Sequence, residues 1–227
     1  MSDQKYFNVP VQLISGFMDN SSDCLNNIFD YAVYQMSLKY EGTEAQNFLK
    51  ACKWFEVKTG DDMKSIRNGK ILNANIIHSS PKVGISLKMW FDFYQNEKSD
   101  FDKICFLGFL AIKSILQTKP YCKIDNKYWL SRMDGKVKAI SEFRELSKTI
   151  SKYASEYQTV KIKKELRIGW GLTTYSRYTR GFYVSLSMTI EELVFEAEKR
   201  RKSTKDKLYR EQEKEALKKA MNRINNN

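Results

Sequence analysis

One segment, FDKICFLGFLAIKSILQ at residues 101–117, constrains the fold of this chain more than any other. It is strongly apolar, yet it is shorter than the roughly 18 apolar residues that a membrane-spanning helix requires. Lys119 and Pro120 end it, because proline lacks a backbone N–H and cannot continue a helix. The segment therefore predicts a buried helix at the centre of a core. A chain of 227 residues is long enough for one large domain or two small ones.

The sequence carries no recognisable targeting signal or metal motif. Its first residues, MSDQKYFNVPVQ, lack the basic start and apolar stretch of a signal peptide, which predicts a cytoplasmic protein. The cysteines stand singly, without a CxxC pair, and His78 is the only histidine available to help bind zinc. We therefore expect buried free thiols, no metal and no cofactor.

The basic charge is confined to the second half of the chain. Residues 1–118 hold 13 Lys/Arg and 13 Asp/Glu, whereas residues 119–227 hold 26 Lys/Arg and 14 Asp/Glu. Such asymmetry is typical of a segment that binds a polyanion, because counterion release from phosphates grows with the number of cations that reach them. Part of the excess also fits a solvated basic tail, and composition does not separate the two.

The N-terminal half predicts three helices and a hairpin. Capping signals and apolar residues spaced by three and four predict helices at about residues 21–36 and 43–55, with a short third helix at 61–67. Alternating residues on both sides of a turn at 79–81 predict two paired strands. We therefore expect residues 1–99 to form a mainly helical domain, and a winged helix there is left open.

Two features of this half invite a catalytic interpretation. Glu56, Val57 and Lys58 form an ExK triplet, which in restriction-type nucleases supplies a metal ligand and a charge stabiliser. That chemistry also needs an upstream acid on a neighbouring strand, and here the triplet ends a predicted helix. His78 has no serine or cysteine motif to pair with, which favours a residue in a turn. A metal-dependent nuclease is kept as a minor alternative, and no catalytic residue is predicted.

The C-terminal half has a definite order of elements. After the apolar helix we expect a short strand at 121–124, a brief helix at 127–133 and a longer helix at 137–154. Alternation then predicts strands at 160–168 and 182–186, joined by a long loop. The helix at 137–154 would bury its apolar face and expose a stripe of serines and cations that contains no carboxylate. The members of this stripe are Ser141, Arg144, Ser147 or Lys148, Ser151 and Lys152.

This order resembles the winged helix-turn-helix superfamily over residues 101–187, through its elements and not through a residue signature. The resemblance implies that residues 137–154 are the recognition helix in the DNA major groove, and that residues 169–181 are the wing. It also implies a domain division at 1–99, 100–188 and 189–227. The fold is then mainly α (α+β), with a C-terminal winged helix and a long basic C-terminal helix that begins at a TIEE capping box.

The implied partner is double-stranded DNA, bound without a cofactor. Arg144 is the candidate for a guanine edge, and the serines can donate to bases or phosphates. Lysines position the protein on phosphates, whereas wing arginines and tyrosines would meet the groove wall. The predicted DNA-binding residues are Ser141, Arg144, Ser147, Lys148, Ser151, Lys152, Lys161, Lys163, Tyr175, Arg177, Tyr178 and Arg180.

The predicted function is sequence-specific DNA binding, by a transcription regulator or by a replication or partition factor of a mobile element. A protein-interaction or scaffold module that uses the same fold is the alternative. If the N-terminal half is a second winged helix, the tandem is similar to plasmid replication initiators of the Rep class. A homodimer is left open, and no membrane contact is expected.

Overall fold

The computed structural model describes residues 5–57, 63–77, 79–176 and 181–225. Within them the chain is mainly helical with two small antiparallel sheets, which confirms the prediction of a mainly α, α+β fold. The first half contains β1 (Tyr6–Pro10), η1 (Val11–Ile14), α1 (Ser21–Ser37), α2 (Glu44–Phe55), α3 (Lys64–Asn75), β2 (Lys82–Ser86) and α4 (Leu87–Gln95). The second half contains α5 (Asp100–Leu116), β3 (Cys122–Ile124), α6 (Asn126–Met133), η2 (Phe143–Glu145), α7 (Lys148–Ser151), α8 (Glu156–Gly169), β4 (Thr173–Ser176), β5 (Phe182–Ser185) and α9 (Ile190–Asn225).

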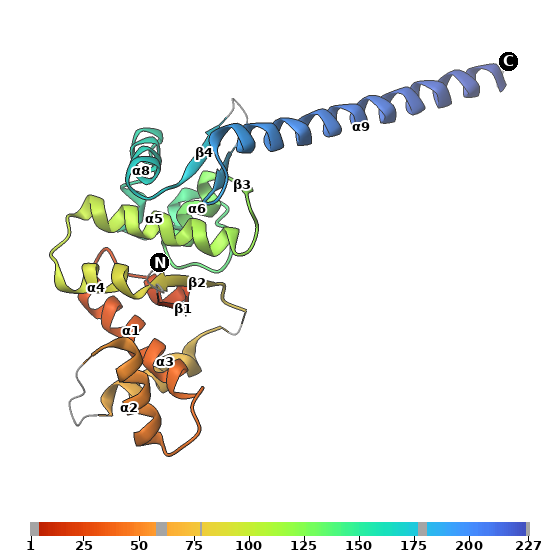
Figure 1. Ribbon diagram of the computed structural model, residues 1–227. Coiled ribbons are helices and arrows are strands. Elements are labelled where there is room, and N and C mark those ends of the chain that lie inside the picture. The colour runs from red at the N-terminus through yellow and green to blue at the C-terminus, as the bar shows by residue number, and fades with distance from the viewer. Residues whose placement is uncertain (1–4, 58–62, 78, 177–180, 226–227) are drawn as a thin grey trace.

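The first two helices begin where the sequence predicts them. The Asn20 side chain caps α1, and Thr43 and Gln46 form the expected capping box of α2. The hairpin around residues 79–81 is wrong, because most of its first strand belongs to α3. The second strand, β2, instead pairs with β1 from the start of the chain, with Phe7 opposite Ile85. α1, α2 and α3 lie together at one end of the molecule (Figure 1).

Gly69 allows α3 to lie directly against α1. A Cβ added at this position would come within 2.3 Å of the Asp30 carbonyl oxygen and 2.5 Å of Tyr34 Cβ, so there is no space for a side chain. Beside it, Asn68 donates a hydrogen bond of 3.0 Å to the Asp30 carboxylate, and Gln35 donates one to Asn73. The two helices are therefore held at a distance that only glycine permits.

Gly69→Ala is expected to destabilise the protein by roughly 2–3 kcal/mol, because overpacking at a backbone contact forces α3 away from α1. Urea unfolding followed by circular dichroism measures the change. Lys70→Ala, on an exposed side of the same helix, is the control and is expected to change stability by less than about 0.5 kcal/mol. Equal stabilities of the two variants would contradict this packing argument.

α5 occupies the centre of the core, as the sequence predicts. Residues 104–112 of this helix are all buried, and the ring of Phe106 stacks on that of Phe93 at 4.2 Å. Lys113 donates a hydrogen bond of 2.6 Å to the Gly84 carbonyl oxygen in β2, which joins α5 to the first sheet. Burial lowers the pKa of Lys113. One continuous cluster of buried residues extends through both halves of the chain. The domain division at residue 99 remains a prediction.

The second sheet has the order β3-β5-β4, with both pairs antiparallel. Val184 in β5 lies between Cys122 in β3 and Thr174 in β4. The strand predicted at 121–124, the helix at 127–133 and the last strand are present, with Asp125 as the residue that caps α6. The strand predicted at 160–168 is wrong, because these residues form α8.

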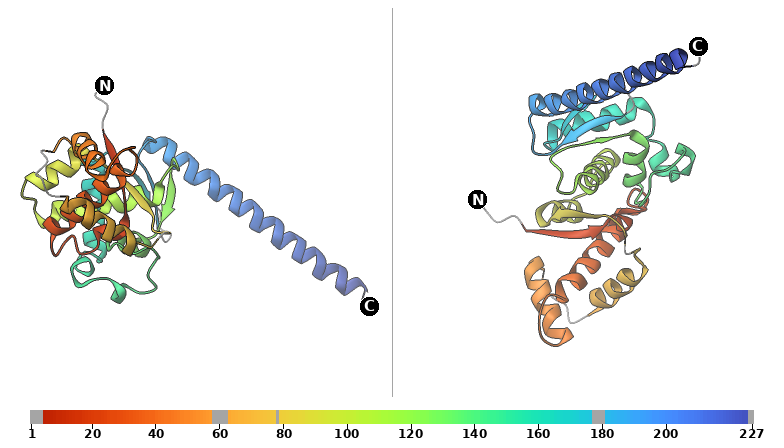
Figure 2. Two further views of the ribbon diagram at one scale, coloured as in Figure 1. Left: turned by 90° about the horizontal axis from the view of Figure 1, so that it is seen from below. Right: turned by 90° about the vertical axis from the view of Figure 1, so that its right-hand side faces the viewer.

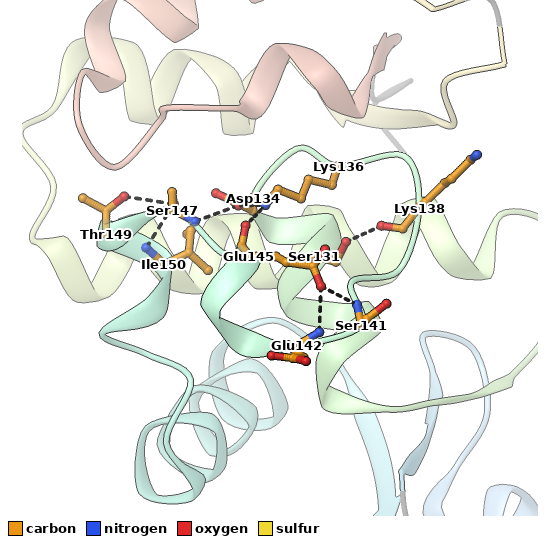
Figure 3. A network of polar contacts seen from close by, with 10 residues as sticks. All are labelled: Ser131, Asp134, Lys136, Lys138, Ser141, Glu142, Glu145, Ser147, Thr149 and Ile150. Atoms are coloured by element: carbon orange, nitrogen blue, oxygen red, sulfur yellow. Dashed lines mark hydrogen bonds and ion pairs between the residues drawn. The ribbon is translucent and has the colours of Figure 1, made fainter.

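The helix predicted at 137–154 is also wrong. Residues 134–155 form an irregular segment that contains only the short elements η2 and α7 (Figure 3). Its apolar residues Ile140, Leu146 and Ile150 are buried, so their helical spacing reflects core contacts and not a continuous helix. Side chains accept hydrogen bonds from backbone N–H groups that a helix would otherwise pair. The Glu145 carboxylate accepts hydrogen bonds of 2.9 and 2.8 Å from the N–H groups of Ser141 and Glu142.

The last helix, α9, projects away from the rest of the protein (Figures 1 and 2). Leu193 and Ala197 near its start are buried where it meets β4 and β5, whereas residues 204–219 are all exposed. The expected helix from the TIEE box is therefore present, and its side chains at residues 205–219 are exposed to solvent. None of the described helices combines the length and the apolar character needed to cross a membrane.

The four cysteines are free thiols, as predicted. Cys24, Cys52 and Cys105 are buried, and Cys122 is half-buried. Burial raises the pKa of Cys105 to about 12 and that of Cys122 to about 11. These thiols are therefore protonated at neutral pH and weakly nucleophilic.

Candidate nucleic-acid interface

The strongest candidate interface is the solvent-facing side of α8. Ser155 caps this helix by accepting a hydrogen bond of 3.3 Å from the Gln158 N–H. Thr159, Ile162 and Leu166 are buried at helical spacing, which fixes the opposite side toward solvent. We call that side the α8 outer face, and it consists of Tyr157, Val160, Lys161, Lys164 and Ile168.

The α8 outer face combines cations with large uncharged side chains. Tyr157, Val160 and Ile168 are 74%, 56% and 71% exposed. Lys161 and Lys164 lie among them, and the Lys161 ammonium is 4.5 Å from the centre of the Phe101 ring. The carboxylates of this helix, Glu156 and Glu165, flank the face and are not part of it. A face with one aromatic side chain, two aliphatic side chains, two lysines and no acid fits a base-lined groove with phosphate walls.

The position of α8 is set by a close contact with α5. Gly108 of α5 faces α8 and α6, and a Cβ added there would lie 3.4 Å from the Ile162 and Leu166 side chains and 3.2 Å from Trp129. The Trp129 indole N–H in α6 donates to the Gly108 carbonyl oxygen at 3.0 Å. α5, α6 and α8 therefore converge on one glycine.

Lys163 points into the protein, although the sequence predicted a phosphate contact. Its ammonium donates to the Asn126 side-chain oxygen at 2.9 Å and lies 3.9 Å above the centre of the Phe182 ring in β5. Burial lowers the pKa of Lys163 to about 8, and the negative charge of Glu156 partly opposes this shift. The side chain joins α8 to α6 and to the second sheet.

Replacing Lys163 by methionine is expected to change how stability depends on pH. Because the folded-state pKa of Lys163 is depressed, the unfolded chain binds more protons between pH 8 and 10.5, and stability rises with pH in this window. Lys163→Met removes that rise, by about 1 kcal/mol after allowance for partial solvent exposure. Urea unfolding of both proteins at the two ends of the window measures it, and parallel pH profiles would contradict it.

The β4–β5 hairpin lies between α8 and the start of α9. The Tyr175 hydroxyl in β4 donates a hydrogen bond of 3.0 Å to the Glu198 carboxylate of α9, and its ring is 6.4 Å from that of Tyr183. Tyr175 thus connects the hairpin to α9. The other predicted wing residues, Arg177, Tyr178 and Arg180, lie outside the described residues.

The residues of the predicted stripe do not share one helix face. Ser141 is in the irregular segment, where its carbonyl oxygen accepts from Lys127 at 2.5 Å. Arg144 belongs to η2, is 82% exposed and pairs with Glu142 at 2.7 Å. Ser147 caps α7, and its N–H donates to the buried Asp134 carboxylate at 3.0 Å (Figure 3). The rest of the stripe, Lys148, Ser151 and Lys152, is exposed in and just after α7.

Of the predicted DNA-binding residues, Lys161 alone lies on the α8 outer face. Tyr157, Val160, Lys164 and Ile168 were missed because residues 160–168 were expected to form a strand. The SEYQ sequence at 155–158 carried the signal: serine followed three residues later by glutamine is a helix-start pattern, and buried positions follow at helical spacing.

The nuclease motif does not form a metal site in the described part of the chain. Glu56 ends α2 in a left-handed conformation with φ of 59° and pairs with Lys5 at 2.6 Å. Lys58 and His78 lie outside the described residues, which contain no group of three or more potential metal ligands.

Comparison with known proteins adds no relative. No protein-family model matches the chain, and neither the curated proteins nor the solved structures contain a match to it.

Proposed function

We propose that residues 100–188 form a winged helix that binds double-stranded DNA, with α8 as its recognition helix. The order α5, β3, α6, α8, β4, β5 and the sheet order β3-β5-β4 support this assignment. The observation that carries the proposal is the α8 outer face, a solvent-exposed helix side with two lysines, three large uncharged side chains and no carboxylate. Residues 134–155 are then an insertion between the two helices of the helix-turn-helix.

The different residue types on the α8 outer face would make different contacts with DNA. Lys161 and Lys164 would contact phosphates, or guanine O6 and N7 where they reach a base edge. Val160 and Ile168 would contact thymine methyl groups, and Tyr157, in the first turn of α8, would lie where recognition helices commonly meet bases. The biological role fits a transcription regulator or a replication or partition factor of a mobile element.

A protein-binding role is the second candidate. The exposed aromatic and aliphatic residues Tyr157, Val160 and Ile168 also suit a hydrophobic protein contact. The net charge of +12 favours DNA, because the excess lies wholly in the half that contains α8.

The test is the affinity of the full chain for duplex DNA at several salt concentrations. We expect enrichment of particular sequences from a random duplex pool, and a fall in affinity of roughly 10³-fold or more between about 50 and 200 mM salt for six or more phosphate contacts. Binding that is absent or independent of salt would overturn the proposal. A pull-down that survives nuclease treatment and is lost on Ile168→Asp would favour the protein-binding role.

A further inference from the structure

The projecting part of α9 has one face made of cations. Five cations follow one another at intervals of eight, three, four and four residues: Lys199, Lys207, Arg210, Lys214 and Lys218. In the interval of eight, the intermediate position at residue 203 is a serine. Because a helix turns by 100° per residue, these positions fall within about 100° of its circumference. We call them the α9 basic stripe, which extends for roughly 30 Å at 1.5 Å per residue.

The α9 basic stripe contains no acidic residue and is open to solvent. The four carboxylates beyond residue 199, Asp206, Glu211, Glu213 and Glu215, all lie outside it. Its cations are exposed, and in the described part of the chain Lys207, Arg210, Lys214 and Lys218 make no ion pair or hydrogen bond. The helix therefore places five cations on one side without a carboxylate among them, with Asp206 and Glu211 just beyond its two edges.

Like charges adjoin one another along the α9 basic stripe. Arg210, Lys214 and Lys218 are successive neighbours at a spacing of four residues, and like charges at that spacing repel each other. The side chains of α9 at residues 205–219 are exposed, so tertiary packing does not offset this repulsion. A polyanion along the stripe would remove the repulsion and neutralise several cations at once.

We propose that the α9 basic stripe binds the phosphate backbone of the same DNA duplex that α8 reads, as a second, sequence-independent contact. This inference rests on the proposed function of α8. β4 contacts both helices, and both lie at the end of the molecule opposite α2 and α3 (Figures 1 and 2). The stripe thus starts next to the recognition helix and lengthens the footprint on the DNA.

The experiment compares two double variants of the full chain that lose the same charge. Arg210→Gln with Lys214→Gln removes two cations from the stripe, whereas Lys205→Gln with Lys219→Gln removes two exposed cations from the other side of the helix. Affinity for a duplex of about 40 base pairs is measured from about 50 to 200 mM salt. Each lost phosphate contact lowers the slope of log affinity against log salt by about 0.9, so the stripe variant is expected to lose about 1.8 and the control far less.

The outcomes separate this inference from the proposed function. Equal loss in both double variants would overturn the inference, because net charge alone would then account for binding. No loss in either, with weaker binding after substitution of Lys161 and Lys164, would overturn it and leave the function of α8 intact. Wild-type protein that binds DNA without salt dependence overturns both. If the stripe variant lost binding to vesicles of anionic lipid while its DNA affinity stayed unchanged, the inference would also be overturned.

Discussion

Replacing Lys161 and Lys164 together by glutamine is expected to weaken DNA binding about 30-fold. Both lie on the α8 outer face, where the buried residues of the helix direct them to solvent. Loss of two charged contacts at about 1 kcal/mol each corresponds to this factor. Their removal is also expected to flatten the salt dependence, by about 0.9 in slope for each lysine that neutralises a phosphate. Fluorescence anisotropy with a labelled duplex measures both quantities.

The matched control removes the same charge from the segment that sequence reasoning favoured. Lys148→Gln with Lys152→Gln changes two exposed lysines in and after α7, and a change of less than about threefold is expected. If this pair weakens binding more than the α8 pair does, then the irregular segment at 134–155 is the interface and the α8 assignment is wrong. The circular dichroism spectra of both variants should match that of the wild type.

Trp129→Ala is expected to destabilise the protein by roughly 3–5 kcal/mol. The side chain is fully buried, and its ring meets that of Phe182 edge-on at 5.6 Å. Its indole N–H donates to Gly108, so the substitution leaves a cavity and a buried carbonyl oxygen without this donor. Because the ring connects α6, α5 and β5, its loss should loosen the support beneath α8.

Urea unfolding measures this effect, and DNA affinity provides a second signal. Trp54→Ala is the control, because Trp54 is half-buried at the end of α2, far from α8 in the fold, and should cost less than the Trp129 substitution (Figure 1). At temperatures where Trp129→Ala remains mainly folded, weaker DNA binding is expected from a less well positioned α8. Equal loss of stability in the two variants would contradict a central role for Trp129.

The sequence predicted the elements whose local signals agree with their burial. The helix at 101–117 is buried on nearly every side, so its apolar run is sufficient to identify it. The last strand carries clear alternation, α1 begins at a side-chain N-cap, and α2 begins at a capping box. Local signals were sufficient to predict these elements, although they pack against distant parts of the chain.

The helix predicted at 137–154 and the strand predicted at 160–168 are wrong because the spacing of their apolar residues fits more than one kind of structure. Ile140, Leu146 and Ile150 are buried from an irregular segment, because Asp134 and Glu145 satisfy backbone N–H groups that a helix would otherwise pair. In α8, Ile162 and Leu166 fit both alternation and helical spacing, and Val160 and Ile168 extend the apparent alternation although they are exposed. The helix-start pattern of Ser155 and Gln158 and the packing against Gly108 distinguish the two, and that packing joins residues more than 50 positions apart along the chain.

Gly108, at the centre of α5, has no side chain and so lets α8 pack close to α5. A Cβ at Gly108 would lie 3.4 Å from Ile162 and Leu166, which is an ordinary contact, and 3.2 Å from Trp129, so a side chain larger than that of alanine would displace α6 or α8 from the core. The lysines on the α8 outer face would move with that helix. Gly108 is buried, yet it helps to set the position of the side chains on the α8 outer face, and under the proposed function a larger residue there would change DNA binding from inside the core.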